Sequence, residues 1–549
     1  MTGRAVAVVV GCLLWACAPP KTPVPSGTLV VAQELQASWV RNFNPLSLAV
    51  NARWPTRAGV YEPMGVFNSV TGELVPWLAT GSEWREDGER LRVFTRPGVL
   101  WSDGRPFTAG DVAFTFQLLH RFPALDSRGV WKFLARVEVV DEGTVDFVLS
   151  RRFYPGRDDV FAQPIVPRHI WSEVADPVTF DNPSPVATGP FTEVRQFKNQ
   201  VFELGRNPHY WQPGRPKVEA LRFPAYSNNE RANLAVVFDE VDWAGNFVPA
   251  IERVYVARDP KAHRYWFPLT GSEVFLYLNA TQAPYADVRV RKALSQAIDR
   301  QLLVDVAVFR YSRPADATGL SDAFASWRSP DVVAAHRWTA FNPTEVARLL
   351  DEAGLTKDEG GHRRLPGGAP WTVELLVVAG WSDWVRAAQV IARNLRAMGI
   401  DTTVRALDFS AWYQRVREGR FEASLGWSFE GATPYAFYRW LMASETKLPV
   451  GEPSMGNWHR FSSPRADAAL QAFETEPDEA RRRERVIDLE RLFAEEAPAI
   501  PLYPNPSWAE YNTARFTGFP SAEAPYADPS PNKFDRGETL LVLTALEPR

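Results

Sequence analysis

Alternating apolar and polar positions predict a β-rich first part of the chain. Residues 29–33 predict an opening strand, and residues 89–101 alternate around Pro97-Gly98, which predicts a hairpin. Residues 137–149 predict another strand–turn–strand unit. Before it, Thr108 can cap a helix over residues 109–119, and Asp111 is placed to complete a capping box.

The second half of the chain alternates strands with amphipathic helices. Asp287 can cap a helix that continues to Phe309, because apolar residues recur there at helical spacing. Asn342-Pro343 opens another helix, which ends at Gly354. A strand over 371–379, a helix over 383–398 and a strand over 402–407 form a βαβ unit, for which parallel pairing is expected. Further elements are expected at 410–418 (helix), 421–427 (strand), 477–496 (helix) and 500–503 (strand).

The N-terminal segment has the pattern of a secretory signal. Arg4 precedes an apolar run over residues 5–15, which is too short to span a bilayer as a mature anchor. Leu14-Trp15-Ala16-Cys17 resembles the bacterial lipobox, which implies a signal peptide over residues 1–17 and a lipid on Cys17. Residues 18–27 then form a Pro-rich tether. Ordinary secretion with cleavage nearby is the alternative.

Composition narrows the class of protein. The 549 residues are 45% hydrophobic and 23% charged, enough to bury several domain cores. The net charge of −4 argues against a dedicated nucleic-acid binder, which needs a basic surface. Both cysteines fall within the first 17 residues, so the mature chain offers no thiol chemistry. Trp (21) outnumbers Tyr (15), so many flat rings lie in cores or in a site that binds by stacking.

Motifs for enzymatic chemistry are missing from the sequence. It contains no Walker A loop, no dinucleotide fingerprint, no zinc-protease motif and no G-x-S-x-G nucleophile elbow. The seven histidines are scattered, with no pair at ligand spacing, so neither a metal nor a cofactor is expected. A glycosidase with two carboxylates from distant segments is the enzyme class that the sequence leaves open.

Several blocks resemble one family, the extracytoplasmic solute-binding proteins of ABC importers in the peptide, nickel and oligosaccharide class. The first block is LATGSEWREDGERLRVFTRPGVLWSDGRPFTAGDVAFTF, at residues 78–116. The others are PIVPRHIW at 164–171, PVATGPF at 185–191, RNPHYW at 206–211, YLN at 277–279 and VRVRKALSQAID at 288–299.

The resemblance implies an α/β, periplasmic-binding-protein-like fold with two lobes around a hinged cleft and an extra domain inserted in the first lobe. Lobe I is expected over 28–60, 185–272 and 506–549, the inserted domain over 61–184, and lobe II over 273–505. The implied function is capture without chemistry: the closed, ligand-bound form is recognised by membrane permease subunits. The expected protein is a monomeric, extracytoplasmic lipoprotein held at a membrane by its lipid.

Two ligand classes compete within this family. Its peptide binders commonly use an Asp of the second lobe to pair with the ligand's α-amino group, whereas the corresponding stretch here, 426–435, offers Glu430. Residues 226–230, 241–247 and 264–268 instead resemble the cello-oligosaccharide-binding branch. Sugars stack their C–H faces on aromatic rings and hydrogen-bond to amides and carboxylates. We therefore expect a β-linked oligosaccharide, with an oligopeptide as the alternative. The candidate binding residues are Trp39, Asn44, Asn228, Trp243, Asn246, Trp381, Trp427, Glu430 and Tyr435.

Overall fold

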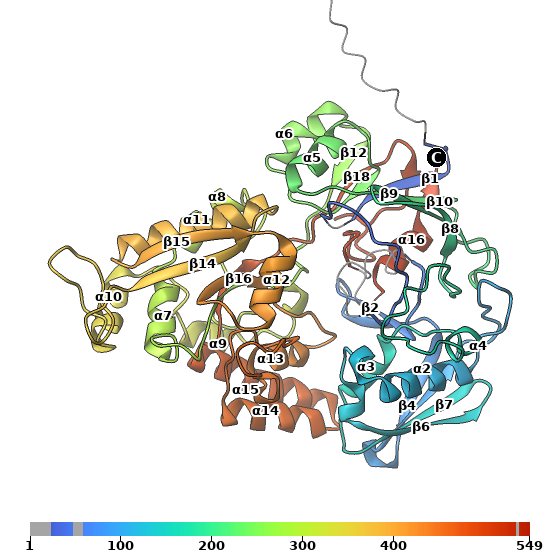
Figure 1. Cartoon of the computed structure of the whole chain (residues 1–549), viewed down its shortest axis with the longest axis horizontal. Coiled ribbons are helices and arrows are strands. Elements are labelled where there is room, and N and C mark those ends of the chain that lie inside the picture. Colours follow the sequence, from blue (N-terminus) through green and yellow to red (C-terminus); the bar gives the residue numbers. More distant parts are fainter. Residues whose placement is uncertain (1–23, 34, 48–58, 534–536) are drawn as a thin grey trace, which may run out of the picture.

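The computed structural model describes residues 24–33, 35–47, 59–533 and 537–549. The expected signal peptide, Cys17 and most of the tether lie outside these ranges. Figure 1 shows three parts of the molecule: lobe I at the upper right, the inserted domain below it, and lobe II at the left.

Lobe I is built on a seven-stranded mixed sheet. The strand β1 (Thr28–Ala32) lies inside it and pairs in parallel with β10 (Ala220–Pro224) and β11 (Trp243–Ala244). The full order is β12-β18-β11-β1-β10-β9-β8, where β8 is Phe191–Lys198, β9 Val201–Arg206, β12 His263–Tyr265 and β18 Glu510–Asn512. The helices of this lobe are α5 (Asn229–Val237), α6 (Ile251–Val254) and α16 (Thr539–Ala545).

The inserted domain packs α2 (Ala109–Arg121) on an antiparallel sheet of order β4-β5-β7-β6. The expected capping box of α2 is present at Thr108 and Asp111. The expected hairpin around Pro97-Gly98 is wrong, because β5 ends at Thr95 and its partners are β4 and β7. The strands are β4 (Ala79–Arg85), β5 (Arg90–Thr95), β6 (Leu134–Asp141) and β7 (Thr144–Leu149), and the short helices are α3 (Gly156–Phe161) and α4 (Arg168–Trp171).

A glycine allows close backbone packing where the chain leaves lobe I for the inserted domain and returns from it. A Cβ atom on Gly189 would lie 2.2 Å from the carbonyl oxygen of Gly59 and 2.4 Å from that of Val60. The glycine of the Thr-Gly-Pro-Phe block is therefore needed for a close approach of two backbone segments. Two small sheets pair β2 (Gly65–Asn68) with β3 (Glu73–Pro76) and β19 (Phe516–Thr517) with β20 (Glu547–Pro548).

Lobe II has a five-stranded sheet of order β15-β14-β16-β13-β17. The strands β14 (Thr372–Val378) and β15 (Asp401–Leu407) pair in parallel through α11 (Ser382–Ala397), which confirms the βαβ prediction. The single helix expected over 287–309 is wrong: Asp299 caps a second helix there. The remaining strands are β13 (Glu273–Leu278), β16 (Ala423–Trp427) and β17 (Ile500–Pro504). The remaining helices are α7 (Val288–Gln296), α8 (Arg300–Ala307), α9 (Pro330–Ala335), α10 (Pro343–Glu352), α12 (Phe409–Arg417), α13 (Pro434–Met442), α14 (Pro464–Thr475) and α15 (Glu479–Glu496).

Two antiparallel segments connect the lobes, and we call residues 266–272 with 505–509 the crossing ribbon. Trp266 N donates to Ala509 O (3.1 Å), Ser507 N to Pro268 O (2.8 Å) and Asn505 N to Ser272 O (2.8 Å). The ribbon thus continues the pairing of β12 with β18 in lobe I into the pairing of β13 with β17 in lobe II. A two-stranded link of this kind can bend while the sheets at its ends stay intact.

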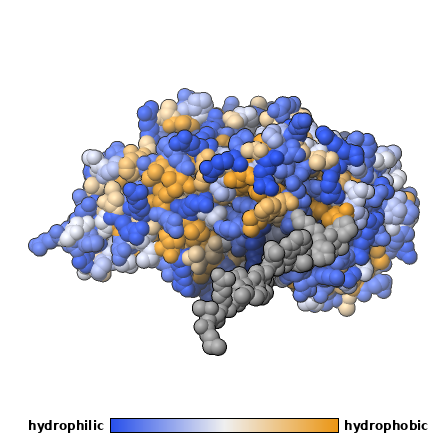
Figure 2. Space-filling view, turned by 90° about the horizontal axis from the view of Figure 1, so that it is seen from above, coloured by the Kyte–Doolittle hydropathy of each residue, from blue (hydrophilic) through white to orange (hydrophobic). Residues whose placement is uncertain are grey.

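The surface of the molecule is mixed. Figure 2 shows hydrophilic side chains around the rim of the face seen from above, with apolar ones gathered toward its middle. Among the described residues, no helix combines the length and the apolar character needed to cross a bilayer.

Candidate ligand-binding site

Strand ends and the crossing ribbon define which edge of the lobe II sheet faces lobe I. Glu273, at the start of β13, pairs with Pro504 at the end of β17, and Val274 pairs with Trp427 at the end of β16. The strand β14 runs parallel to β16 and to β15, so the ends of these three strands share that edge. In open α/β sheets, ligands bind outside such carboxyl ends. Side chains that follow β14, β15 and β16 are therefore candidates for binding.

Aromatic rings occupy this edge as a continuous cluster. The rings of Phe409 and Trp427 are nearly parallel, at 10° and 6.3 Å, and Trp381 lies 6.1 Å from Trp427. Trp458 connects Trp427 (5.2 Å) to Trp440 (5.4 Å). Phe429 stacks on Trp440 at 5.3 Å. We call the partly exposed rings the aromatic wall: Trp381, Phe409, Trp427, Phe429 and Trp440.

Buried rings hold the wall in place from behind. Trp384, Trp412 and Trp458 are at most 3% exposed and contact Trp427 at 6.3, 5.1 and 5.2 Å. The indole N–H of Trp412 donates to Ser424 Oγ (3.0 Å), which ties the cluster to β16. Rings fixed in this way lose little conformational freedom when a flat ligand stacks on them.

Asp383 is a buried acid in the first turn of α11, between two rings of the cluster. Its side chain is 5% exposed, and burial raises the pKa of its carboxyl to about 6, although backbone N–H groups of the first turn and Arg386 act to lower it. The raised pKa means that the folded protein binds this proton more tightly than the unfolded chain does.

The raised pKa of Asp383 predicts a pH-dependent stability. Between pH 4 and pH 6 the folded state holds the proton that the unfolded state releases, so the contribution of Asp383 to the free energy of unfolding falls as pH rises through this window. The loss is on the order of 2–3 kcal/mol and is complete above pH 6. We expect Asp383→Asn to gain stability relative to wild type across the same window, measured by urea unfolding at several pH values.

Asp488→Asn, on an exposed part of α15, is the matched control, because it makes the same substitution at a carboxylate that faces solvent. A stability difference between Asp383→Asn and wild type that stays constant across the window would show that the Asp383 carboxyl does not titrate as described.

The facing edge of lobe I carries two of the expected asparagines. Asn228 caps α5 by accepting from Arg231 N (3.0 Å), and its neighbour Asn229 donates from its backbone N to Gly380 O of lobe II (3.3 Å). Asn246 follows β11, is 5% exposed and donates to the side chain of Asn233. Its Oδ1 atom is buried without a hydrogen-bond partner among the described residues. The lobes therefore already touch next to the aromatic wall.

The carboxylate expected to bind the ligand already has a partner in the protein. Glu430 follows β16 and forms an ion pair with Lys533, which comes from the C-terminal segment of lobe I. Lys533 Nζ also donates to Thr270 O of the crossing ribbon (3.1 Å). This contact joins the end of the aromatic wall to the opposite lobe.

Four expected site residues lie in the protein interior, with polar atoms already bonded. Trp39 donates to Phe223 O (3.0 Å), and Trp243 donates to Pro529 O (2.8 Å). The side chains of Asn44 and Tyr435 are also hydrogen-bonded within the protein. Asn44 donates to the carbonyls of 177 and 180, and Tyr435 donates to the Glu474 carboxylate (2.7 Å). All four are at most 3% exposed, so they present no face to a ligand in this conformation.

Sequence reasoning did not select Phe409, Phe429, Trp440 or Lys533. Phe409 had a readable signal, because it follows the strand that pairs in parallel with the one before Trp381. No local pattern in the sequence indicated Lys533, because 103 positions separate it from Glu430.

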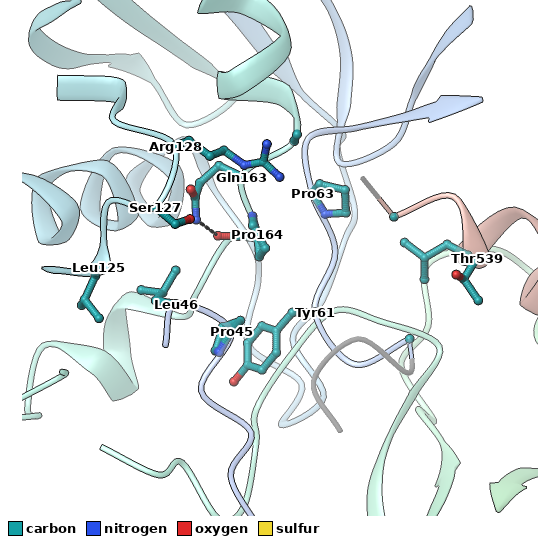
Figure 3. A pocket seen from close by; sticks show the side chains of 14 residues that line it. Pro45, Leu46, Tyr61, Pro63, Leu125, Ser127, Arg128, Gln163, Pro164 and Thr539 are labelled. Carbon is teal, nitrogen blue, oxygen red and sulfur yellow. Dashed lines mark hydrogen bonds between the residues drawn. The ribbon is translucent and has the colours of Figure 1, made fainter. Parts of the chain in front are cut away.

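A hollow lies between lobe I and the inserted domain (Figure 3). Its lining includes Leu46, Tyr61, Leu125 and Gln163, and none of the wall's rings is among the described lining residues. Gln163 Nε2 donates to Pro164 O (3.1 Å) at its border. Among the described residues, this lining holds one aromatic ring, that of Tyr61, instead of the cluster of rings at the lobe II edge.

The described part of the chain shows no metal-binding cluster of side chains. No group of three or more His, Cys, Asp or Glu side chains there is arranged to hold an ion. The facing edges thus offer flat apolar rings, amides, the buried carboxyl of Asp383 and the Glu430 carboxylate, which is paired within the protein.

Comparison with protein families gives one match that covers most of the chain. Residues 73–448 match the family described as bacterial extracellular solute-binding proteins, family 5. The chain is 26% identical over 409 residues to the nickel-binding periplasmic protein of Escherichia coli (71% of this chain, 74% of that protein). It is 22% identical over 484 residues to di/tripeptide-binding protein 2 of Pseudomonas aeruginosa (81% and 83%).

Solved structures give the same result for the fold. A mannohexaose-bound periplasmic oligopeptide-binding protein of an oligopeptide ABC transporter from Thermotoga maritima superposes with a TM-score of 0.87 at 26% identity, covering 96% of this chain and all of that one. A nonapeptide-bound oligopeptide-binding protein from Bacillus subtilis superposes with a TM-score of 0.78 at 19% identity, covering 92% and 98%. The periplasmic-binding-protein-like α/β fold expected from the sequence is confirmed.

Proposed function

The chain belongs to the bacterial extracellular solute-binding proteins of family 5, and on that premise we propose that it captures an uncharged oligosaccharide between its lobes for an ABC importer. The aromatic wall carries the proposal. Partly exposed, rigid rings suit the C–H faces of sugars, and amides on the opposite edge suit hydroxyl groups. The residues proposed to contact the ligand are Trp381, Phe409, Trp427, Asn228 and Asn246.

Binding couples to transport through closure of the lobes. A ligand that contacts the wall and the asparagine edge together favours the closed form by its differential affinity for that form. The closed form is then recognised by the permease subunits, and the ligand leaves chemically unchanged. A monomer tethered through a lipid on Cys17 would act close to that permease.

An oligopeptide receptor is the second candidate. It is favoured by the similarity to di/tripeptide-binding protein 2 and to the glutathione-binding protein GsiB of Salmonella typhi, which is 26% identical over 443 residues (77% of this chain, 79% of that protein). The mannohexaose-bound neighbour supports the sugar instead.

Tryptophan fluorescence separates the two candidates, because three of the five wall rings are indoles. We expect saturable quenching with β-linked gluco- or manno-oligosaccharides and none with a mixture of short peptides. Quenching by the peptides alone would replace the first candidate with the second. Incubation with the bound sugar should yield no cleaved product, and cleavage would instead indicate a glycosidase.

A further inference from the structure

Lys533 places a positive charge of the protein at the end of the ligand site. Its ammonium contacts the Glu430 carboxylate of lobe II, Thr270 O (3.1 Å) and, more distantly, Asp528 Oδ2 (3.8 Å). The Lys533 side chain is 13% exposed, whereas that of Glu430 is 34% exposed. The acid therefore still reaches solvent, while the cation that neutralises it lies behind it.

Glu430 is continuous with the aromatic wall. It directly follows Phe429, which stacks on Trp440, and it comes three residues after Trp427. A ligand lying on the wall would extend toward this carboxylate. An unpaired carboxylate there would attract a cationic group of the ligand, because opposite charges attract more strongly in surroundings that are less polar than water.

The surroundings keep Lys533 charged and in position. Thr270 Oγ1 donates to Asp528 Oδ2 (2.7 Å) and Ser530 N donates to Asp528 Oδ1 (3.0 Å), so this second acid is fixed beside the ammonium. Burial alone would lower the pKa of Lys533, but the carboxylates of Glu430, Asp528 and Glu538 outweigh it and raise that pKa. The ammonium is thus a permanent part of the site at neutral pH.

We propose that Lys533 is a specificity-determining residue, whose ammonium occupies Glu430 so that the site rejects cationic ligands and accepts uncharged ones. The inference rests on the proposed function for the location of the ligand. A cationic ligand would have to displace Lys533 and leave its ammonium partly buried beside one acid fewer, or sit next to it and be repelled. The rejection therefore comes from a built-in counter-ion.

Lys533→Gln tests this, because glutamine can still donate to Thr270 O while the charge is gone. The probes are tri-alanine with a free amino terminus and N-acetyl-tri-alanine, in which the acetyl group replaces the positive charge of the amino terminus. Wild type should bind the free peptide no better than the acetylated one. The variant should prefer the free peptide at least tenfold by isothermal titration calorimetry.

Three further variants test whether the effect depends on the charge of Lys533 and on the Glu430 carboxylate. Lys533→Arg keeps the charge and should, like wild type, bind the free peptide no better than the acetylated one. Lys533→Gln combined with Glu430→Gln should lose the acquired preference, because no carboxylate is released. Lys217→Gln, an exposed lysine paired with Glu547 in lobe I, is the matched control and should leave the ratio unchanged.

Equal affinity of the Lys533→Gln variant for both peptides, or binding of neither, overturns the proposal. Thermal unfolding of each variant checks that it is folded, and Lys533→Met is the substitute if the glutamine variant is not. The affinities for the free and the acetylated peptide are compared in the absence of sugar, so this comparison does not depend on sugar binding. A wild type that binds no oligosaccharide would therefore refute the proposed function, while an acquired preference for the free amine would still stand.

Discussion

Trp427→Ala is expected to weaken oligosaccharide binding by about 30-fold to 100-fold, the loss typical of a central aromatic anchor. Trp427 lies at the centre of the cluster, since its ring contacts those of Trp381 (6.1 Å), Phe409 (6.3 Å), Trp412 (5.1 Å) and Trp458 (5.2 Å). Its removal takes away one stacking face and loosens the neighbouring rings. Calorimetric titration with the preferred sugar measures the loss.

Two controls separate binding from folding. Trp427→Phe keeps a flat ring and should retain most of the affinity. Trp131→Ala removes a partly buried tryptophan of the inserted domain, which stacks on His120, and should lower stability without changing affinity. If Trp427→Ala bound as tightly as wild type while remaining folded, the wall would not be the ligand surface.

Gly271→Ala is expected to disturb the crossing ribbon and lower the free energy of unfolding by about 3 kcal/mol, the upper part of the range for overpacking. A Cβ atom at this position would lie 2.1 Å from Asn505 O and 3.1 Å from its carbonyl carbon, which are backbone atoms of the opposite segment. The segments must then separate at the point where both lobes join. Urea unfolding measures the loss, and small-angle scattering with ligand should show a less compact complex.

Gly81→Ala is the matched control, because a Cβ atom on Gly81 of β4 meets no other atom within 4 Å. It should change the free energy of unfolding by less than about 1 kcal/mol. If the Gly271→Ala protein had the stability and compactness of wild type, the crossing ribbon would accommodate the extra methyl group without loss of stability. The closure of the lobes would then not depend on the close packing of this ribbon.

The residues behind these predictions all lie where the two lobes face each other. The wall supplies rigid stacking faces, the ribbon allows the lobes to approach, and the Lys533–Glu430 pair sets the charge where they meet. Affinity, closure and selectivity would thus depend on different residues and can be changed separately.

Local patterns in the sequence determined the elements and the family. The capping box at Thr108, the βαβ unit that joins β14 to β15 and the family blocks were all readable, because caps, periodicity and turns depend on neighbouring residues. The same patterns failed at Pro97-Gly98, where a turn signal could not reveal which strands would pair. They failed again at Asp299, which starts a new helix inside an apolar stripe.

The sequence alone also indicated which tryptophans follow strands, and so placed Trp381 and Trp427 near a sheet edge. The structure distinguishes them from Trp39 and Trp243, whose indoles are buried and hydrogen-bonded inside lobe I. Whether a ring points into the core depends on packing against residues that are distant in the sequence. The pairing of Glu430 with Lys533 was decided entirely by tertiary structure. Charges more than a hundred positions apart become partners only after two lobes have folded and met.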